Sequence, residues 1–249
     1  MKTLALYSIK GGVGKTATAV NLAWQLAKQG ERVLLWDLDP QGAASFYLKV
    51  APQIKGNARK LVGGKFDLAT RIQTSEHHGL DLLPADISYR NMDIHLDEAK
   101  RSKHRFGEIL KPLRKSYDIV VIDCPPNLSL VSENIFRIAD PILVPLIPTT
   151  LSLRTWEQLL GWFSEQGIER DRLAPFLTLV DRRKKLHREV AGQLAASEPA
   201  LLRSAIPYAS DVERMGLHQA PLATFAPRSA AARACRELTA EVVDLLARV

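Results

Sequence analysis

The sequence predicts an α/β fold: a doubly wound, mostly parallel sheet of seven or eight strands flanked by helices. Three observations predict it. Short apolar runs recur along the chain, a glycine-rich turn follows the first run, and a segment with helical spacing follows that turn. Strand, helix and strand within about forty residues form a βαβ unit, whose strands are parallel. With 46% hydrophobic residues, the chain can fill one large core, so we expect residues 1–249 to form one domain.

The elements are expected in the following places. Short apolar runs predict strands at residues 4–9, 33–36, 80–84, 117–123, 141–148 and 173–180. Apolar residues at helical spacing predict helices from residue 15 to just before 30, and over 102–115, 152–166 and 230–247. Residues 221–225 are predicted to form an edge strand. Residues 50–79 show no sustained period and are expected to form an irregular excursion with one or two short helices.

The glycine-rich turn between the first strand and the first helix covers residues 9–16. Its three glycines let successive backbone N–H groups converge on one anion, and the helix that follows adds a partial positive charge at its N-terminus. Lys15 can then contact the β- and γ-phosphates of a nucleotide, and the Thr16 hydroxyl can hold Mg²⁺. The expected nucleotide contacts are Gly11, Gly12, Val13, Gly14, Lys15, Thr16 and Ala17.

Acidic residues follow two of the later strands. Asp39 comes soon after the strand at 33–36, and Asp123 ends the apolar run at 117–123. Ligands of parallel sheets bind beyond the carboxyl ends of the strands, so both carboxylates are expected beside the phosphate loop. A carboxylate in the place of Asp123 is typical of a Walker B element, which holds Mg²⁺, and one in the place of Asp39 can polarise a water molecule. The alternative for Asp39 is a helix N-cap before Pro40.

These segments resemble the ParA/MinD family of P-loop ATPases. Residues 10–16 match its deviant Walker A motif, K-G-G-x-G-K followed by serine or threonine, at every defined position, whereas a strict P-loop would have glycine in place of Ile9. D-x-D-P-Q-G at 37–42, D-x-P-P at 123–126 and P-R-S at 227–229 also match. The resemblance covers nearly the whole chain and is closest to the small, Soj-like ParA partition ATPases.

The resemblance implies an ATPase with ATP and Mg²⁺ as cofactors, which forms a homodimer on binding ATP. Lys10 of one subunit would reach the ATP held by the other, and Asp39 would orient the attacking water, so the implied catalytic residues are Lys10, Lys15 and Asp39. The implied metal residues are Thr16, Asp39 and Asp123, with Asp37 supporting the turn. Pro207 is implied as an adenine contact.

The resemblance also implies a cellular role. A ParB-like or adaptor protein would stimulate an otherwise slow hydrolysis, and the protein would bind DNA non-specifically and partition or position a cargo. That cargo, a plasmid, a chromosome origin or a protein assembly, is not named by the sequence, nor is the stimulating partner.

The net charge of +7 favours a polyanionic partner, either nucleic acid or an anionic membrane. The densest basic run follows the predicted strand at 173–180, and Arg183 there occupies the position of a family arginine implicated in DNA binding. Phosphate neutralisation is the physical reason for such a run, and a solvated helix start is the alternative. Asp211 stands where relatives carry a second DNA-binding arginine, so the choice between DNA and lipid as the surface that the protein binds stays open. The candidate DNA contacts are Arg182, Arg183, Lys184, Lys185 and Arg214.

Two other functions stay open. A MinD-like membrane-cycling regulator would end in a basic amphipathic helix, whereas the helix predicted at 230–247 contains three acidic residues. A metabolic ATP-dependent ligase on the same fold would need a substrate site that the sequence does not identify. An iron–sulfur protein would need paired cysteines, but Cys124 and Cys235 lie far apart. Without a signal peptide or an apolar span we expect no stable membrane anchor and a cytoplasmic protein, which is associated with the nucleoid when it holds ATP.

Overall fold

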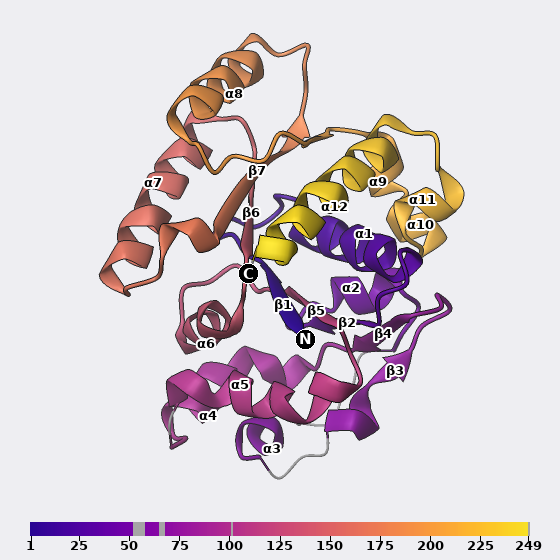
Figure 1. Cartoon of the computed structure of the whole chain (residues 1–249), viewed down its shortest axis with the longest axis vertical. Helices are drawn as coiled ribbons and strands as arrows, with labels where there is room; N and C mark the ends of the chain where they lie inside the picture. Colours follow the sequence, from indigo (N-terminus) through magenta and orange to yellow (C-terminus); the bar gives the residue numbers. More distant parts are fainter. Residues whose placement is uncertain (52–57, 65–67, 101, 249) are drawn as a thin grey trace.

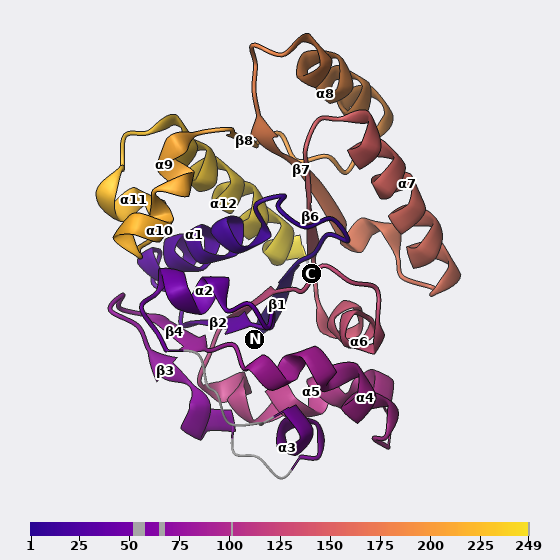
Figure 2. The same ribbon diagram turned by 180° about the vertical axis from the view of Figure 1, so that it is seen from behind.

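A computed structural model of the chain describes residues 1–51, 58–64, 68–100 and 102–248. In these residues eight strands form one sheet in the order β3-β4-β2-β5-β1-β6-β7-β8. All neighbouring pairs are parallel except β3 and β4, which are antiparallel. Helices cover both faces of the sheet (Figures 1 and 2). The predicted doubly wound, mostly parallel sheet is therefore confirmed.

The strands are short, as expected for a sheet covered on both faces. They are β1 Lys2–Leu6, β2 Val33–Asp37, β3 Gln73–Thr74, β4 Leu80–Leu83, β5 Ile119–Asp123, β6 Ile142–Leu146, β7 Leu173–Val180 and β8 Ala205–Pro207. The α-helices are α1 Lys15–Lys28, α2 Ala43–Tyr47, α3 Ala58–Val62, α4 Met92–Asp97, α5 Arg105–Leu110, α6 Leu130–Ile138, α7 Thr150–Glu165, α8 Lys185–Ser197, α9 Ser210–Glu213, α10 Met215–His218, α11 Leu222–Phe225 and α12 Ala230–Arg248. Five short 3₁₀ segments among the described residues are η1 Leu68–Arg71, η2 Ile87–Asn91, η3 Ser102–His104, η4 Lys111–Lys115 and η5 Arg170–Arg172.

Alternate residues of each central strand face two separate hydrophobic cores. In β1, Leu4 and Leu6 pack in a core with α1 and α12, while Ala5 packs in a core with helices α3 to α8. A strand that is buried on both faces needs apolar residues at nearly every position, which is why these strands appear in the sequence as continuous apolar runs. The two cores fix the strand register and so the places where the strands end.

The predicted edge strand at residues 221–225 is wrong, because this stretch forms the short helix α11. Pro221 precedes the helix, and the buried Leu222 donates its N–H to Asn21 Oδ1 at 2.7 Å, which ties the turn to α1. A short apolar run cannot be assigned to strand or helix by its period alone. The edge of the sheet is instead formed by β8, in the segment that contains Pro207.

The helix predicted at 102–115 is divided into η3, α5 and η4. Pro112 lies at the start of η4, and a proline lacks the N–H that a continuous α-helix needs. The excursion at 50–79 contains α3, η1 and β3, while 52–57 and 65–67 of that excursion lie outside the described residues. Within the described ranges, no helix has both the length and the apolar character needed to span a bilayer.

Candidate functional site

Three of the central strands end side by side. The predicted acidic and glycine-rich segments follow them, so these segments lie together along the edge of the sheet formed by the carboxyl ends of its strands. Strand β5 lies between β1 and β2, and its last residue, Asp123, pairs in register with Leu6 of β1 and Asp37 of β2. The glycine-rich loop follows β1 and the Asp39 turn follows β2. Asp39 and Asp123 lie close enough to Lys15 for both carboxylates to act on its pKa. Segments far apart in sequence therefore form one site.

The backbone of the phosphate loop depends on its glycines. Gly12 and Gly14 have φ angles of 71° and 83°, in the left-handed region that favours glycine, and Gly14 is the N-cap of α1. Within the part of the chain that the structure describes, no atom beyond the adjoining residues lies within 4 Å of where a Cβ would stand on Gly11 or Gly12. This open backbone leaves room for an anion to approach the loop closely.

Replacing Gly14 tests its left-handed backbone conformation through the stability of the folded protein, without any measurement of nucleotide binding. A Cβ at Gly14 would stand 3.2 Å from Thr178 Oγ1, on a backbone that alanine rarely adopts. We expect Gly14→Ala to lower the free energy of unfolding by about 1 kcal/mol or more in urea denaturation. Gly161→Ala is the control: it lies inside α7 with open space around its Cβ, so alanine is expected to stabilise the protein there. Wild-type stability in Gly14→Ala would contradict the loop geometry.

Lys15 is a buried cation in the centre of the site. Its side chain is 7% exposed, and its Nζ lies 3.4 Å from the Lys10 carbonyl oxygen, to which it donates. Burial lowers the pKa of Lys15, while Asp123, Cys124 and Asp39 oppose this shift. The Lys10 side chain forms no ion pair with any of the described residues. A buried ammonium group of this kind gains stability from an anionic ligand.

Asp123 has the environment of a cation ligand. The side chain is fully buried, and neither carboxylate oxygen has a hydrogen-bond partner of good geometry among the described residues. Burial is the main cause that raises the pKa of Asp123 to about 8, with Asp37 adding to the rise and Thr16 and Lys15 opposing it. Buried polar atoms are nearly always satisfied, so these oxygens fit a hard cation such as Mg²⁺ or its water ligands.

Asp37 and Asp39 have different roles in the turn after β2. Asp37 Oδ2 accepts hydrogen bonds from the N–H and the Oγ of Ser45, both at 2.7 Å, so it supports the turn as expected. Asp39 Oδ1 accepts from the Gln41 N–H at 3.0 Å. Helix α2 has Gly42 as its N-cap, so the alternative of Asp39 as the helix N-cap is wrong.

Pro207 lines a cavity between the start of α1 and the end of β8. Leu179 has a φ of 51°, and the register of β7 with β8 shifts between Leu177 and Val180, which marks a β-bulge. The buried Thr178 there faces Gly14. The sequence interpretation missed Thr178, because a threonine inside an apolar strand is not distinctive. The cavity is lined by Gly14, Ala17, Thr18, Asn21, Thr178, Leu179, Ile206, Pro207, Val212 and Cys235.

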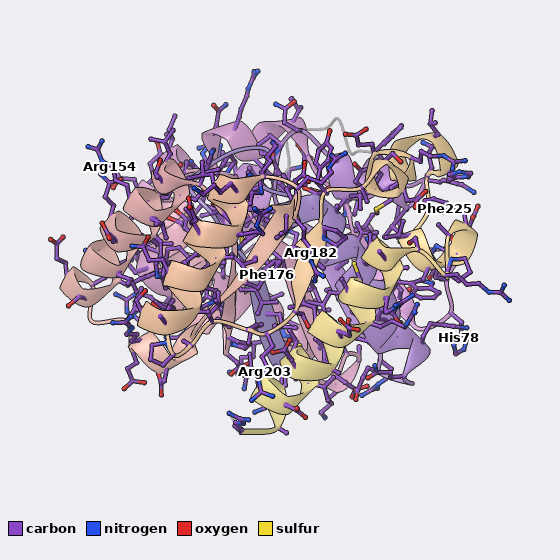
Figure 3. The ribbon with its side chains drawn as sticks, turned by 90° about the horizontal axis from the view of Figure 1, so that it is seen from above. His78, Arg154, Phe176, Arg182, Arg203 and Phe225 are labelled. Carbon is purple, nitrogen blue, oxygen red and sulfur yellow. The ribbon has the colours of Figure 1, made fainter. Side chains whose placement is uncertain are left out.

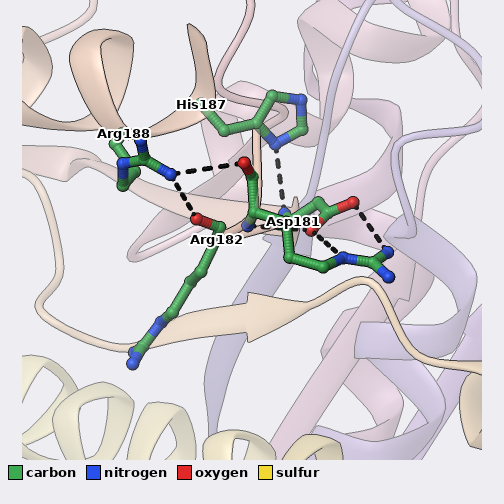
Figure 4. Close-up of polar contacts among 5 residues, drawn as sticks. Asp181, Arg182, His187 and Arg188 are labelled. Carbon is green, nitrogen blue, oxygen red and sulfur yellow. Dashed lines mark hydrogen bonds and ion pairs between the residues drawn. The ribbon is translucent and has the colours of Figure 1, made fainter. Parts of the chain in front are cut away.

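The basic run lies directly after β7, at the same edge of the sheet, and its side chains are exposed. Asp181 accepts from Arg183 through both oxygens, at 2.9 Å from Nε and 3.0 Å from Nη2, and this lowers the pKa of Asp181 to about 2. Arg188 Nη1 donates to the Arg182 carbonyl oxygen at 2.8 Å, and the Asp181 N–H donates to His187 Nδ1 at 3.1 Å (Figure 4). The first turn of α8 thus fixes the conformation of residues 182–185, which we call the basic loop.

Arg214, the remaining candidate DNA contact, lies in a different segment, between α9 and α10. It is exposed and pairs with Asp211 at 3.8 Å, so the acidic residue at the expected arginine position partly neutralises its charge. The Arg182 and Arg203 side chains are labelled in Figure 3, and both are exposed.

Comparison with known proteins agrees with this arrangement. A family model described as an AAA domain matches residues 1–170. The chain is 36% identical over 203 residues to the chromosome partitioning protein ParA of Caulobacter vibrioides, which covers 79% of this chain and 76% of that protein. The chain belongs to the ParA/MinD family of P-loop ATPases. It is also 29% identical over 247 residues to the sporulation initiation inhibitor protein Soj of Bacillus subtilis, covering 97% of this chain and 98% of Soj.

Two solved structures share the fold. Cobyrinic acid a,c-diamide synthase from Mycobacterium smegmatis, solved with a bound ATP analogue and magnesium, is 29% identical with a TM-score of 0.81, over 98% of this chain and 94% of that one. The cell division ATPase MinD of Pyrococcus furiosus is 22% identical with a TM-score of 0.78, over 98% of this chain and 99% of that one, and shows the fold alone.

Proposed function

We propose that this ParA-family protein is an ATPase that dimerises on binding ATP, binds DNA non-specifically and partitions or positions a cargo. The observation that carries the proposal is the meeting of Lys15, Asp39 and Asp123 at one edge of the sheet, where a phosphate loop follows β1. A relative named for chromosome partitioning, the ParA protein of Caulobacter vibrioides, supports the cargo-moving role.

Each group of the site has a task in the proposed hydrolysis. The backbone N–H groups of residues 11–16 and the Lys15 ammonium would bind the phosphates, and Thr16 and Asp123 would hold Mg²⁺ with Asp39 in its water shell. The metal, when bound, neutralises phosphate charge. Asp39 would orient the attacking water, and Pro207 would contact the adenine. In this proposal the protein binds ATP and Mg²⁺ because two features fit them. These are the open glycine backbone and the buried Asp123 oxygens, which have no hydrogen-bond partner of good geometry among the described residues.

Exposed apolar side chains support a second copy as the partner at this edge. Among the described residues, most large exposed hydrophobic side chains follow soon after the carboxyl end of a strand. A contiguous apolar patch at such a place is typical of a surface that is covered in an assembly. These side chains are Phe46, Ile87, Leu128, Leu151, Leu186 and Tyr208. A homodimer formed over this edge would place Lys10 of each protomer at the nucleotide of the other.

Hydrolysis is expected to be slow in a lone protomer, which lacks the partner's Lys10. A ParB-like or adaptor protein would stimulate it and reset the cycle. In cells we expect the ATP-bound dimer to associate with the nucleoid, through phosphate contacts of the basic loop at 182–185.

Charge reversal in the basic loop tests the DNA surface. Arg183→Glu is expected to weaken binding to random-sequence DNA roughly tenfold, about equally for all sequences, and to reduce the salt dependence, as loss of a phosphate contact does. The measurement is a gel shift with and without ATP across a salt series. Arg203→Glu makes the same charge change in the connection before β8 and serves as control. If Arg203→Glu weakens binding as much as Arg183→Glu, the basic loop is not the DNA surface.

A MinD-like membrane cycle is less well supported. Helix α12 buries one face in the core shared with α1, including Leu238, Val242 and Leu246, so it belongs to the fold. Liposome sedimentation beside the gel shifts tests this alternative directly.

A metabolic ligase is the second candidate, favoured by the 29% identity to a diamide synthase. ATP turnover that depends on an added carboxylate substrate and a nitrogen donor, and not on DNA or a partner protein, would favour the ligase.

A further inference from the structure

Ser45 connects three segments around the Asp39 turn. Its N–H and Oγ both donate to Asp37 Oδ2 at 2.7 Å, and its Oγ accepts from the Ala85 N–H at 3.0 Å. Asp37, Ser45 and Ala85 are each 0% exposed. Hydrogen bonds in such a dry place are costly to lose, because the groups left behind cannot bond to water.

The place of these bonds in the fold gives Ser45 its importance. Asp37 is the last residue of β2, Ala85 follows the end of the neighbouring strand β4, and Ser45 lies in α2. The turn that carries Asp39 runs between Asp37 and Ser45, so the bond between these two residues closes the turn at its base. The bond to Ala85 then anchors the closed turn to the adjacent strand end.

The hydrogen bonds of Asp39 itself are local to the turn. Asp39 Oδ1 accepts from the Gln41 N–H, and its carbonyl oxygen accepts from the Gly42 N–H at 3.0 Å. These bonds shape the turn but leave its place relative to β2 and β4 undefined. Its place on the sheet is fixed by the contacts of Ser45 and, next to Asp39, by the Leu38 N–H, which donates to the Asp123 carbonyl oxygen at 3.1 Å.

We propose that Ser45 is a positioning residue for hydrolysis, which acts through Asp37 to hold the Asp39 carboxylate at the edge where the phosphates bind. This inference rests on the proposed function, in which Asp39 orients the attacking water. Ser45 does not belong to the phosphate loop and is expected to contribute little to ATP affinity. The expected signature is a lower kcat at an unchanged dissociation constant for ATP.

The test compares Ser45→Ala, Ser45→Thr and a control, Ser75→Ala, by single-turnover phosphate release. Ser75 also makes several hydrogen bonds through its hydroxyl, but in the connection between β3 and β4, at the opposite end of β4 from Ala85. We expect Ser45→Ala to lower the single-turnover rate of hydrolysis by about tenfold or more, because a small misplacement of a catalytic group is costly. Ser45→Thr keeps the hydroxyl and is expected to recover most of the rate, and Ser75→Ala to keep the wild-type rate.

Several results would overturn the inference. A wild-type rate in Ser45→Ala would do so, as would an equal loss of ATP affinity and kcat, or a loss of rate in Ser75→Ala as large as in Ser45→Ala. If Ser45→Ala does not fold, Ser45→Cys replaces it, and a wild-type rate with that weaker donor overturns the inference equally. Failure of the proposed function looks different: the wild-type protein would then show no hydrolysis that depends on Lys15.

Discussion

Lys15→Ala is expected to abolish detectable binding of Mg²⁺–ATP. Lys15 is a buried ammonium group among Asp39, Asp123 and the phosphate loop, with Nζ held toward the Lys10 carbonyl oxygen. Its removal would leave the phosphates without the main charge partner that we propose for them, in a buried site. We expect a loss of at least about a hundredfold in affinity, as for truncation of one partner of a buried charge pair.

Isothermal titration with ATP in the presence of Mg²⁺ measures this loss. Lys28→Ala is the matched control, because Lys28 lies on the same helix, α1, but is exposed near its C-terminal end. The control is expected to bind ATP like the wild type. Micromolar or tighter affinity in a folded Lys15→Ala protein would contradict the phosphate-loop assignment.

Asp39→Ala is expected to trap an ATP-bound dimer. The Asp39 carboxylate lies in a turn beside the phosphate loop. In the proposed mechanism, its replacement removes the group that would orient water but none of the groups that would bind phosphate. Light scattering with ATP and Mg²⁺ is expected to show a doubled molar mass that persists for hours. Asp97→Ala, an exposed carboxylate on α4, is the control and should return to monomer as ATP is consumed. Only monomer at saturating ATP in Asp39→Ala would contradict a nucleotide-dependent dimer.

The parts of the site that sequence predicted are those in which residue type determines local geometry. Gly12 and Gly14 adopt left-handed backbone conformations that few other residues tolerate, so a glycine-rich turn predicts its own shape. Asp123 ends a continuous apolar run, and parallel strands end at a common edge, so its place follows from the fold class.

The parts that sequence did not predict depend on tertiary contacts. Leu179 adopts a left-handed backbone conformation at a bulge between β7 and β8, which nothing in its residue type indicates. Ser45 is one serine among many until the register of β2 with β4 brings Ala85 to it. The density of basic residues predicted exposed side chains after β7. The bidentate ion pair of Arg183 with Asp181 depends on the folded conformation of this loop, which the sequence does not specify.

The most direct test of the central claim mixes two inactive variants. If two protomers share each nucleotide, Lys10→Ala and Asp39→Ala are each inactive alone, but a mixed dimer contains one complete site, with Asp39 from one protomer and Lys10 from the other. Proteins mixed before ATP is added are expected to regain about a quarter of the wild-type rate, because half of the random dimers are mixed and each has one complete site. A mixture as inactive as its two components would contradict a site completed by the partner.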